Sequence, residues 1–318
     1  MDNFTLSDYH LKAGETATVT LVFSEVVASF EAADITADTG TLGTMTSSNN
    51  ITWTGTFTPT ADEEDAGNTL SLATSYTDTA GNTGTAATTL NYEVDTLAPS
   101  VISFTLSDTA LKAGETATVE LVFSEAVASF SAADINLDNA TGTLPSMTSS
   151  DNITWTGTFT PTANREASNT LSLATSYTDT AGNAGPDNTT ANYEIDTLLP
   201  SVSSIVISAS GIQNNFLNAG DNVSVTATFS ENVPVTGTPQ LTLVVGSDNR
   251  TATFASGSGS APLVFQYTIL AGDNDTNGIS IGENALALNS GTIRDAAGNN
   301  ATLTHSSVAD NSSYMVDT

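Results

Sequence analysis

Acidic residues stand at three kinds of position in this sequence, and each kind recurs along the chain. One is the glutamate of a Phe-Ser-Glu triplet, one is the aspartate that opens an Asp-Thr-Ala-Gly-Asn or Asp-Ala-Ala-Gly-Asn segment, and one is the aspartate of a Val-Asp-Thr or Ile-Asp-Thr triplet. These residues are Glu25, Glu125 and Glu231; Asp78, Asp179 and Asp295; and Asp95, Asp196 and Asp317. Carboxylates supplemented by amide and backbone oxygens form the oxygen shell that Ca2+ prefers, so their chemistry points to calcium binding.

A separate acidic segment, Asp273 to Gly278, is similar to the start of a calcium-binding loop. Asp273, Asp275 and Asn277 fit the Asp-x-Asp-x-Asn-Gly opening of such loops and are candidate metal ligands. The twelfth position holds Asn284 where these loops have a bidentate glutamate, and no flanking helices are evident. A plain hairpin loop rich in Asn and Gly is therefore the alternative.

The charge balance restricts the partners. The chain has 35 acidic residues against 5 Lys and Arg residues, which gives a formal net charge of -30. Nucleic acid and anionic lipid headgroups both require clustered Lys and Arg, so the sequence excludes nucleic acid and disfavours anionic lipid surfaces. No apolar run approaches the roughly 20 residues needed to span a bilayer, so the sequence predicts no direct membrane insertion. Divalent cations such as Ca2+ would neutralise part of this charge. Because the chain has no cysteine, it can form neither disulfides nor thiolate metal sites.

The recurring acids belong to an internal repeat. The segment FTLSDYHLKAGETATVTLVFSE from Phe4 returns as FTLSDTALKAGETATVELVFSE from Phe104, and ITWTGTFTPTA from Ile51 returns from Ile153. A third copy is longer and diverged, but it keeps VSVTATFSE, DAAGN and VDT. The predicted domains are residues 1–97, 98–198 and 199–318.

Alternating side chains predict strands within each repeat. Apolar residues occupy every second position, with Thr commonly between them, as expected for a strand with one buried face. Such runs are Ala17, Val19, Leu21 and Phe23, then Leu70 and Leu72, then Leu90, Tyr92 and Val94. About seven short strands per repeat predict an all-β fold of three tandem immunoglobulin-like antiparallel β-sandwich domains in an extended array. Trp53 and Trp155 lie at inward strand positions, which favours core packing over ligand stacking.

The sequence resembles the bacterial Ig-like repeats of large secreted surface adhesins, which are often exported by type I secretion and carry RTX-type C-termini. The resemblance rests on AGETATVTLVFSE, SYTDTAGN and VDTLAPSV in the first repeat, on their equivalents in the second, and on GDNVSVTATFSENV, GTIRDAAGN and VDT in the third. It covers nearly the whole chain. The resemblance implies an extended, extracellular protein of the bacterial cell surface with calcium at its joints.

The topology of such a sandwich predicts that the acids meet at the domain joints. The loops that carry Phe-Ser-Glu and Asp-Thr-Ala-Gly-Asn lie at the end where the chain enters a domain, whereas the last strand finishes at the opposite end. The expected ligands are Asp95, Glu125, Asp179 and Asn183 at the first joint, and Asp196, Glu231, Asp295 and Asn299 at the second. Glu25 and Asp78 are expected ligands at the start of the first domain, where they lack an upstream partner. Each acid could instead be a solvated loop charge.

Two further features flank the joints. Pro99 and Pro200 follow the terminal aspartates and favour short, stiff linkers. The acidic run from Asp62 to Asp65 is replaced in part in the second repeat, so we predict that it is only a solvated loop. The sequence starts and ends abruptly, and we expect any export signal or anchor to lie outside it.

Together these features predict a non-catalytic, calcium-rigidified extender of a bacterial cell-surface adhesin. It would project a distal binding domain for adhesion or biofilm formation. The expected partners are neighbouring Ig-like repeats of the same chain, in a monomer. The alternative is a carbohydrate- or protein-binding module centred on the third domain, which a face of exposed aromatic residues would favour. Catalysis finds little support, because the two histidines, His10 and His305, fall at non-equivalent places.

Overall fold

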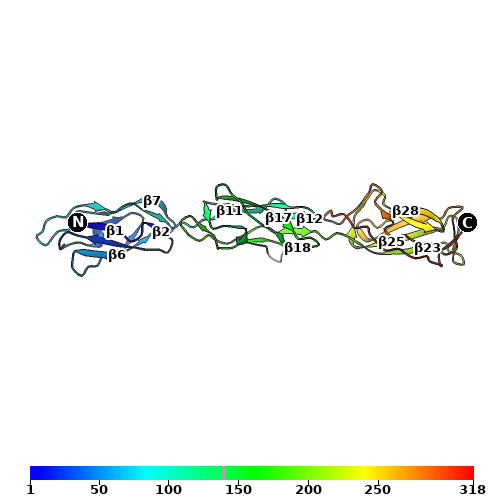
Figure 1. The fold of residues 1–318 in the computed structure, drawn as a ribbon, viewed down its shortest axis with the longest axis horizontal. Helices are drawn as coiled ribbons and strands as arrows, with labels where there is room; N and C mark the ends of the chain where they lie inside the picture. The colour runs from blue at the N-terminus through cyan, green and yellow to red at the C-terminus, as the bar shows by residue number, and fades with distance from the viewer. Residues whose placement is uncertain (138–140) are drawn as a thin grey trace.

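A computed structural model of the protein describes residues 1–137 and 141–318. Figure 1 shows three β-sheet domains that follow one another along a line, with the two termini toward opposite ends of the array. Helical structure in the described residues is limited to the one-turn 3-10 helices η1 (Ala32–Asp34) and η2 (Ala132–Asp134). None of these helices is long and apolar enough to cross a membrane. The predicted all-β fold of tandem sandwiches is confirmed.

Domain 1 consists of short strands arranged in three sheets. Its strands are β1 (Asn3–Leu6), β2 (His10–Lys12), β3 (Ala17–Val22), β4 (Ile35–Ala37), β5 (Gly40–Leu42), β6 (Thr52–Pro59), β7 (Glu64–Asn68), β8 (Leu70–Leu72), β9 (Ala87–Thr88) and β10 (Tyr92–Asp95). The sheet orders are β1-β3-β6-β5, β2-β10-β7 and β4-β8-β9.

Domain 2 repeats this arrangement. Its strands are β11 (Val101–Leu106), β12 (Ala110–Lys112), β13 (Ala117–Phe123), β14 (Val127–Ala128), β15 (Ile135–Leu137), β16 (Gly142–Thr143), β17 (Thr154–Pro161), β18 (Glu166–Asn169), β19 (Leu171–Leu173), β20 (Thr178–Asp179), β21 (Asn188–Thr189) and β22 (Tyr193–Asp196). The sheet orders are β11-β13-β17-β16, β12-β22-β18, β15-β19-β21 and β14-β20.

Domain 3 has a larger main sheet. Its strands are β23 (Val202–Ser210), β24 (Phe216–Leu217), β25 (Asn222–Val233), β26 (Val235–Thr236), β27 (Gln240–Val245), β28 (Asp248–Ser256), β29 (Ser260–Thr268), β30 (Asn274–Asp275), β31 (Leu286–Ala287), β32 (Thr292–Ile293) and β33 (Met315–Asp317). The main sheet has the order β23-β25-β29-β28-β27-β31, and smaller sheets are β24-β33-β30 and β26-β32. The extra residues of the third repeat thus extend the main sheet.

One strand pair in each domain departs from the antiparallel prediction. The strand pairs β2 with β10, β12 with β22, and β24 with β33 are parallel. The chain changes from the first sheet to the second between Leu6 and His10, and the short strand that follows meets the last strand of the domain. This pairing sets Lys12 opposite Asp95 and Lys112 opposite Asp196, at the C-terminal end of each domain.

Each domain has its own hydrophobic core, which the alternating runs supply. Ala17, Val19, Leu21 and Phe23 are all buried, as predicted. Trp53 and Trp155 are half-buried and pack edge-on against Phe30 and Phe130, with ring centroids 5.1 Å and 4.9 Å apart. The expectation for Leu90 was wrong, because this side chain is 73% exposed. Strand β10 begins only at Tyr92, and the buried Thr89 instead turns inward, where its Oγ1 accepts the Leu70 N–H at 3.0 Å.

Candidate metal centres

Both ends of each interdomain linker are fixed by hydrogen bonds. At the start of the first linker, Thr96 Oγ1 donates to the Thr60 carbonyl at 2.7 Å, within domain 1. At its end, the Ser100 N–H donates to Ser124 Oγ and the Ser124 N–H donates to the Ser100 carbonyl, both at 2.9 Å, within domain 2. Pro99 between them is buried. Equivalent contacts in the second linker involve Thr197, Ser201 and Ser230.

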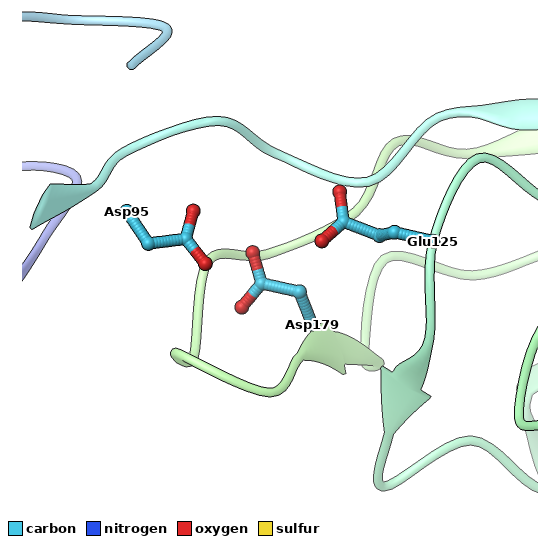
Figure 2. Close-up of side chains that lie close together, drawn as sticks. All are labelled: Asp95, Glu125 and Asp179. Carbon is cyan, nitrogen blue, oxygen red and sulfur yellow. The ribbon is translucent and has the colours of Figure 1, made fainter. Parts of the chain in front are cut away.

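Three carboxylates meet at the first joint. Asp95 ends β10 of domain 1, whereas Glu125 follows β13 and Asp179 ends β20 of domain 2. Each residue offers one oxygen, and these oxygens all lie within 4.8 Å of one another. Figure 2 shows the three side chains turned toward one another from three separate segments. The structure therefore brings together the three carboxylates that the topology placed at this joint.

The second joint repeats this cluster. Asp196 ends β22 of domain 2, while Glu231 and Asp295 belong to domain 3. Their ligand oxygens also lie within 4.8 Å of one another. Asp179 and Asp295 are almost completely buried, at 1% and 3% exposure, whereas the other acids of both clusters are half-buried.

A tight turn holds the buried aspartate at each joint. Asp179 Oδ1 accepts the N–H groups of Gly182 and Asn183 at 2.6 and 2.8 Å, and its Oδ2 accepts Asn183 Nδ2–H at 2.7 Å. Gly182 has a φ of 99°, which side chains with a Cβ rarely adopt. A carboxylate has about four lone-pair directions, so Asp179 retains one for another partner. The turn in domain 3 makes the same contacts with Asp295, Gly298 and Asn299.

The two asparagines of the predicted ligand sets contact the preceding domain directly. Asn183 Oδ1 accepts the Ala13 N–H at 2.8 Å, and Asn299 Oδ1 accepts the Ala113 N–H at 2.8 Å. Their amide oxygens are thus engaged by backbone donors of the neighbouring domain.

Burial and like charge both disfavour ionised acids at the joints. Burial raises the pKa of Asp95 and of Glu125 above the ordinary value, and the charge of Asp179 raises the pKa of both further. Burial likewise raises the pKa of Asp196 and of Glu231, with Asp295 as the next cause. Two like charges 4–5 Å apart repel by roughly 3–4 kcal/mol at an effective dielectric constant of about 20. Each joint therefore contains a repulsion that a bound cation would relieve.

The prediction of a solvated loop for residues 62–65 missed an acidic neighbour of the first cluster. Glu64 lies in β7 directly opposite Asp95, and its charge further raises the pKa of Asp95 and of Glu125. Glu166 lies opposite Asp196 in the same way. The sequence held a signal for this neighbour: Glu64 of the first repeat has an equivalent in Glu166 of the second, although the surrounding segments differ.

The donor set at each joint fits a hard divalent cation. Ca2+ binds oxygen at about 2.3–2.6 Å, so two oxygens on one ion can lie at most roughly 5 Å apart. The 4.8 Å limit of both clusters satisfies this condition. The clusters contain only carboxylates, which suit Ca2+ or Mg2+ better than Zn2+. Among the described residues, acidic or histidine groups with this geometry occur at the two joints alone.

The segment Asp273 to Gly278 does not form such a cluster. Asp273 is buried and accepts Arg250 Nε–H at 2.7 Å and the Tyr267 hydroxyl at 2.5 Å. Asp275 is also buried and accepts backbone N–H groups, including that of Gly278 at 2.7 Å. Protein donors thus satisfy these carboxylates. Asn277 instead donates through Nδ2 to Asp310 at 2.7 Å.

The remaining candidate ligands lie in domain 1 and at the end of domain 3. Glu25 is exposed and Asp78 is half-buried. Hydrogen bonds from Asn82 lower the pKa of Asp78. Asp317, at the other end of the chain, lies at the end of β33. Glu25, Asp78 and Asp317 therefore lie outside the two clusters.

Comparisons with solved structures gave distant likenesses. The chain is similar to the N-terminal eight Ig domains of Down Syndrome Cell Adhesion Molecule, with 11% identity and a TM-score of 0.28 over 97% of this chain and 36% of that chain. It is also similar to the full extracellular region of Plexin A4, with 8% identity and a TM-score of 0.19 over 86% of this chain and 22% of that chain. It thus spans about a third of the first chain and less of the second, and these scores support no argument on function.

The family assignment rests on the sequence. No curated protein gave a significant match. The profile of the bacterial Ig-like domain matches residues 3–94 and again residues 95–195. The matched segments correspond to the first two sandwiches, and the second match contains all three acids of the first joint, Asp95, Glu125 and Asp179. Because the two matches together span more than half of the chain, this protein belongs to the bacterial Ig-like domain family.

Proposed function

We propose that the protein is a non-catalytic, calcium-rigidified extender segment of a bacterial cell-surface adhesin. The observation that supports this most directly is the meeting of Asp95 from one domain with Glu125 and Asp179 from the next. A second cluster of the same composition lies at the second joint. Repetition at both joints fits a role in the geometry of the whole array better than a role in one reaction.

The charge of the acids at each joint would control how far the two domains bend relative to each other. Asp95 is fixed to domain 1 by the pairing of β10 with β7, and Asp179 is fixed to domain 2 by its turn. Ca2+ would supply charge neutralisation and oxygen coordination across the joint. Without a cation the repulsion among the carboxylates opposes the straight arrangement. With a cation, carboxylates of both domains would share one ion, and bending at the joint would break ligand contacts.

The extracellular location is part of the same proposal. A chain with a formal net charge of -30 and tandem bacterial Ig-like domains fits an exported surface protein of the RTX-adhesin type, which would serve adhesion or biofilm formation. Its partners would be neighbouring Ig-like repeats of the same polypeptide. The array would be monomeric and would hold a distal binding domain away from the cell.

The aromatic residues of domain 3 do not favour the alternative of a ligand-binding module. Phe265 and Tyr267 are buried in the core of the domain. Phe216 is half-buried, and Phe254 and Tyr314 pack against the same core. These side chains therefore form no exposed stacking face.

Small-angle X-ray scattering and calorimetric melts, in millimolar Ca2+ and in chelator, test the proposal. We expect Ca2+ to straighten the wild-type array and to raise its melting temperature, because an ion at about 100 times its Kd stabilises the bound state by about 2.7 kcal/mol. The variant with Asp95→Asn and Asp196→Asn should lose both responses.

A matched control is the variant with Asp8→Asn and Asp108→Asn, which has the same change in charge. Asp8 and Asp108 each accept a local backbone N–H away from the clusters. This control should respond to Ca2+ as the wild type does. Scattering and melting that are the same with and without Ca2+ in the wild type would contradict the proposal.

A further inference from the structure

Strand β23 forms one edge of the main sheet of domain 3. In the described part of the chain its strand neighbour is β25 alone, so one side of its backbone has no strand beside it. Its nine residues include no charged residue and no proline. Natural edge strands are commonly short, or carry charges, prolines or bulges that prevent further pairing. Apart from one register shift between Val202 and Ser204, β23 lacks these features, so its open side can accept another strand.

Pairing on the open side begins next to β23 and then stops. Ser201 lies opposite Thr302 in a single parallel bridge, and the Thr302 N–H donates to the Pro200 carbonyl at 2.7 Å. Residues 303–307 belong to no strand. Between β23 and this segment the chain leaves a groove of about 740 Å³, lined by residues 202–205, 283–284 and 304–308.

The wall of the groove opposite β23 is held by hydrogen bonds within domain 3. Val308 and Ile281 exchange both backbone hydrogen bonds, at 2.8 and 2.9 Å. His305 Nε2 accepts the Ala285 N–H at 2.8 Å, and the His305 N–H donates to Asn284 Oδ1 at 3.0 Å. These bonds fix the segment in place, so the groove is formed before any ligand binds.

The groove combines an apolar floor with an acidic rim. Val202, Ile205 and Val308 are half-buried and pack against the hydrophobic core of the domain. Glu283 is exposed at the groove, no Lys or Arg lines it, and the chain as a whole has a formal net charge of -30. Successive side chains of an extended peptide point to opposite faces. A peptide in this groove would therefore direct apolar side chains to the floor and positively charged side chains to the acidic surface.

We propose that this groove binds an extended segment of another protein, in which apolar residues alternate with Lys or Arg. The segment adds a strand to the open side of β23, so main-chain hydrogen bonds supply the affinity and the alternate side chains supply the specificity. A second copy of the chain does not fit this chemistry, because it has 35 acidic residues against 5 Lys and Arg residues. No acid of the two joint clusters lines the groove, so the inference does not rest on the proposed function.

Fluorescence anisotropy tests whether backbone pairing drives the binding. The probe is the fluorescein-labelled, amidated peptide Lys-Val-Lys-Val-Lys-Val-Lys, titrated with the full chain in millimolar Ca2+. The comparison is the same peptide with every backbone nitrogen methylated, which keeps the charge and the side chains but has no N–H to donate to a strand. We expect the methylated peptide to bind at least tenfold more weakly. Equal affinities would overturn the proposal, because charge attraction alone would then explain the binding.

A charge on the exposed face of β23 tests the location. Val206 is 56% exposed, and Val206→Lys adds the kind of charge that protects natural edge strands. The control is Ile102→Lys, the same change at a residue that is 66% exposed on β11 of domain 2. We expect at least a fivefold loss of affinity for the unmodified peptide in Val206→Lys and less than a twofold loss in the control. Equal losses in the two variants would overturn the proposal.

Hydrogen–deuterium exchange measured by mass spectrometry reports the added strand directly. At saturation the unmodified peptide should slow amide exchange in residues 202–210, whereas the methylated peptide should not. Bound peptide with unchanged exchange in these residues would overturn the proposal. The extender concerns only the response to Ca2+, so an array whose shape ignores Ca2+ contradicts the extender and leaves this docking site standing.

Discussion

Glu64 lies directly opposite Asp95 on the paired strands β7 and β10, and Glu166 lies opposite Asp196 on β18 and β22. Each glutamate adds negative charge next to a joint from outside the three-carboxylate cluster. Directly opposite residues of an antiparallel pair have Cβ atoms about 4.5–5.5 Å apart, within range of electrostatic interaction. The paired glutamate and aspartate thus make the C-terminal end of domains 1 and 2 strongly acidic.

Removing this outer charge should weaken cation binding without abolishing it. We expect Glu64→Gln to lower the Ca2+ affinity of the first joint by a factor of about 1.4 to 5, since exposed charge pairs contribute about 0.2–1 kcal/mol. Isothermal titration calorimetry measures the change. Asp62→Asn is the matched control, because Asp62 belongs to the same acidic run but lies in the preceding turn. Equal losses in both variants would indicate a general charge effect instead of a local one.

Acidification should straighten the joints in the absence of Ca2+ and loosen them in its presence. In the folded protein the pKa values of Asp95, Glu125, Asp196 and Glu231 are raised. A raised carboxyl pKa means that the folded state binds the proton more tightly than the unfolded state does. The contribution of such a carboxyl group to the stability of the folded array is therefore present below the unfolded pKa, and it is lost as pH rises through the folded pKa. Without Ca2+, lowering the pH from 7 toward about 4.5 should therefore straighten the joints.

With Ca2+ present, the same acidification should loosen the joints, because protons compete with the cation for the carboxylates. Scattering profiles at a series of pH values, in calcium-free and calcium-containing buffer, measure both trends. A response of the same sign in the two buffers would show that these carboxylates do not control the joints.

Removing the backbone N–H groups that donate to Asn183 and Asn299 across the joints should loosen the joints at constant charge. Ala13→Pro with Ala113→Pro deletes the N–H groups that Asn183 and Asn299 accept. The turn at Ala13 has a positive φ at Gly14, which fits proline at the preceding position, so the domains themselves should keep or slightly gain stability. We expect greater bending in scattering, with each domain melting at or slightly above its wild-type temperature. Ala13→Ser with Ala113→Ser keeps both N–H groups and should behave as the wild type.

The core of domain 1 should be sensitive to one added methyl group. A Cβ at Gly84 would lie 2.1 Å from the Tyr76 ring, whereas a Cβ at Gly67 would meet only Asp65 at 3.7 Å. Overpacking of this kind costs about 1–3 kcal/mol. Gly84→Ala should therefore lower the melting temperature of domain 1 by about 4–24 °C. Gly67→Ala is the control in the same domain. Calorimetry measures both variants, and equal melting temperatures for Gly84→Ala and Gly67→Ala would contradict the packing argument.

Much of the candidate site could be predicted because its acids are repeated at fixed places between strands. A strand with alternating apolar residues has a defined inner face, and the topology of a sandwich then assigns each loop to one end of the domain. Asp95, Glu125 and Asp179 could be grouped on that basis. Leu90 could not be placed correctly, because the alternation continued past the point where β10 begins.

By itself the sequence determined the repeat, the all-β fold and the grouping of acids at the joints, because these follow from local side-chain patterns. Only the tertiary structure decided that β2 lies parallel to β10, that Glu64 lies beside Asp95, and that Asn183 pairs with Ala13. A strand pattern specifies which face is buried but not which strand lies alongside. Hydrogen bonds across a joint depend further on how two folded domains are oriented, which no local pattern encodes.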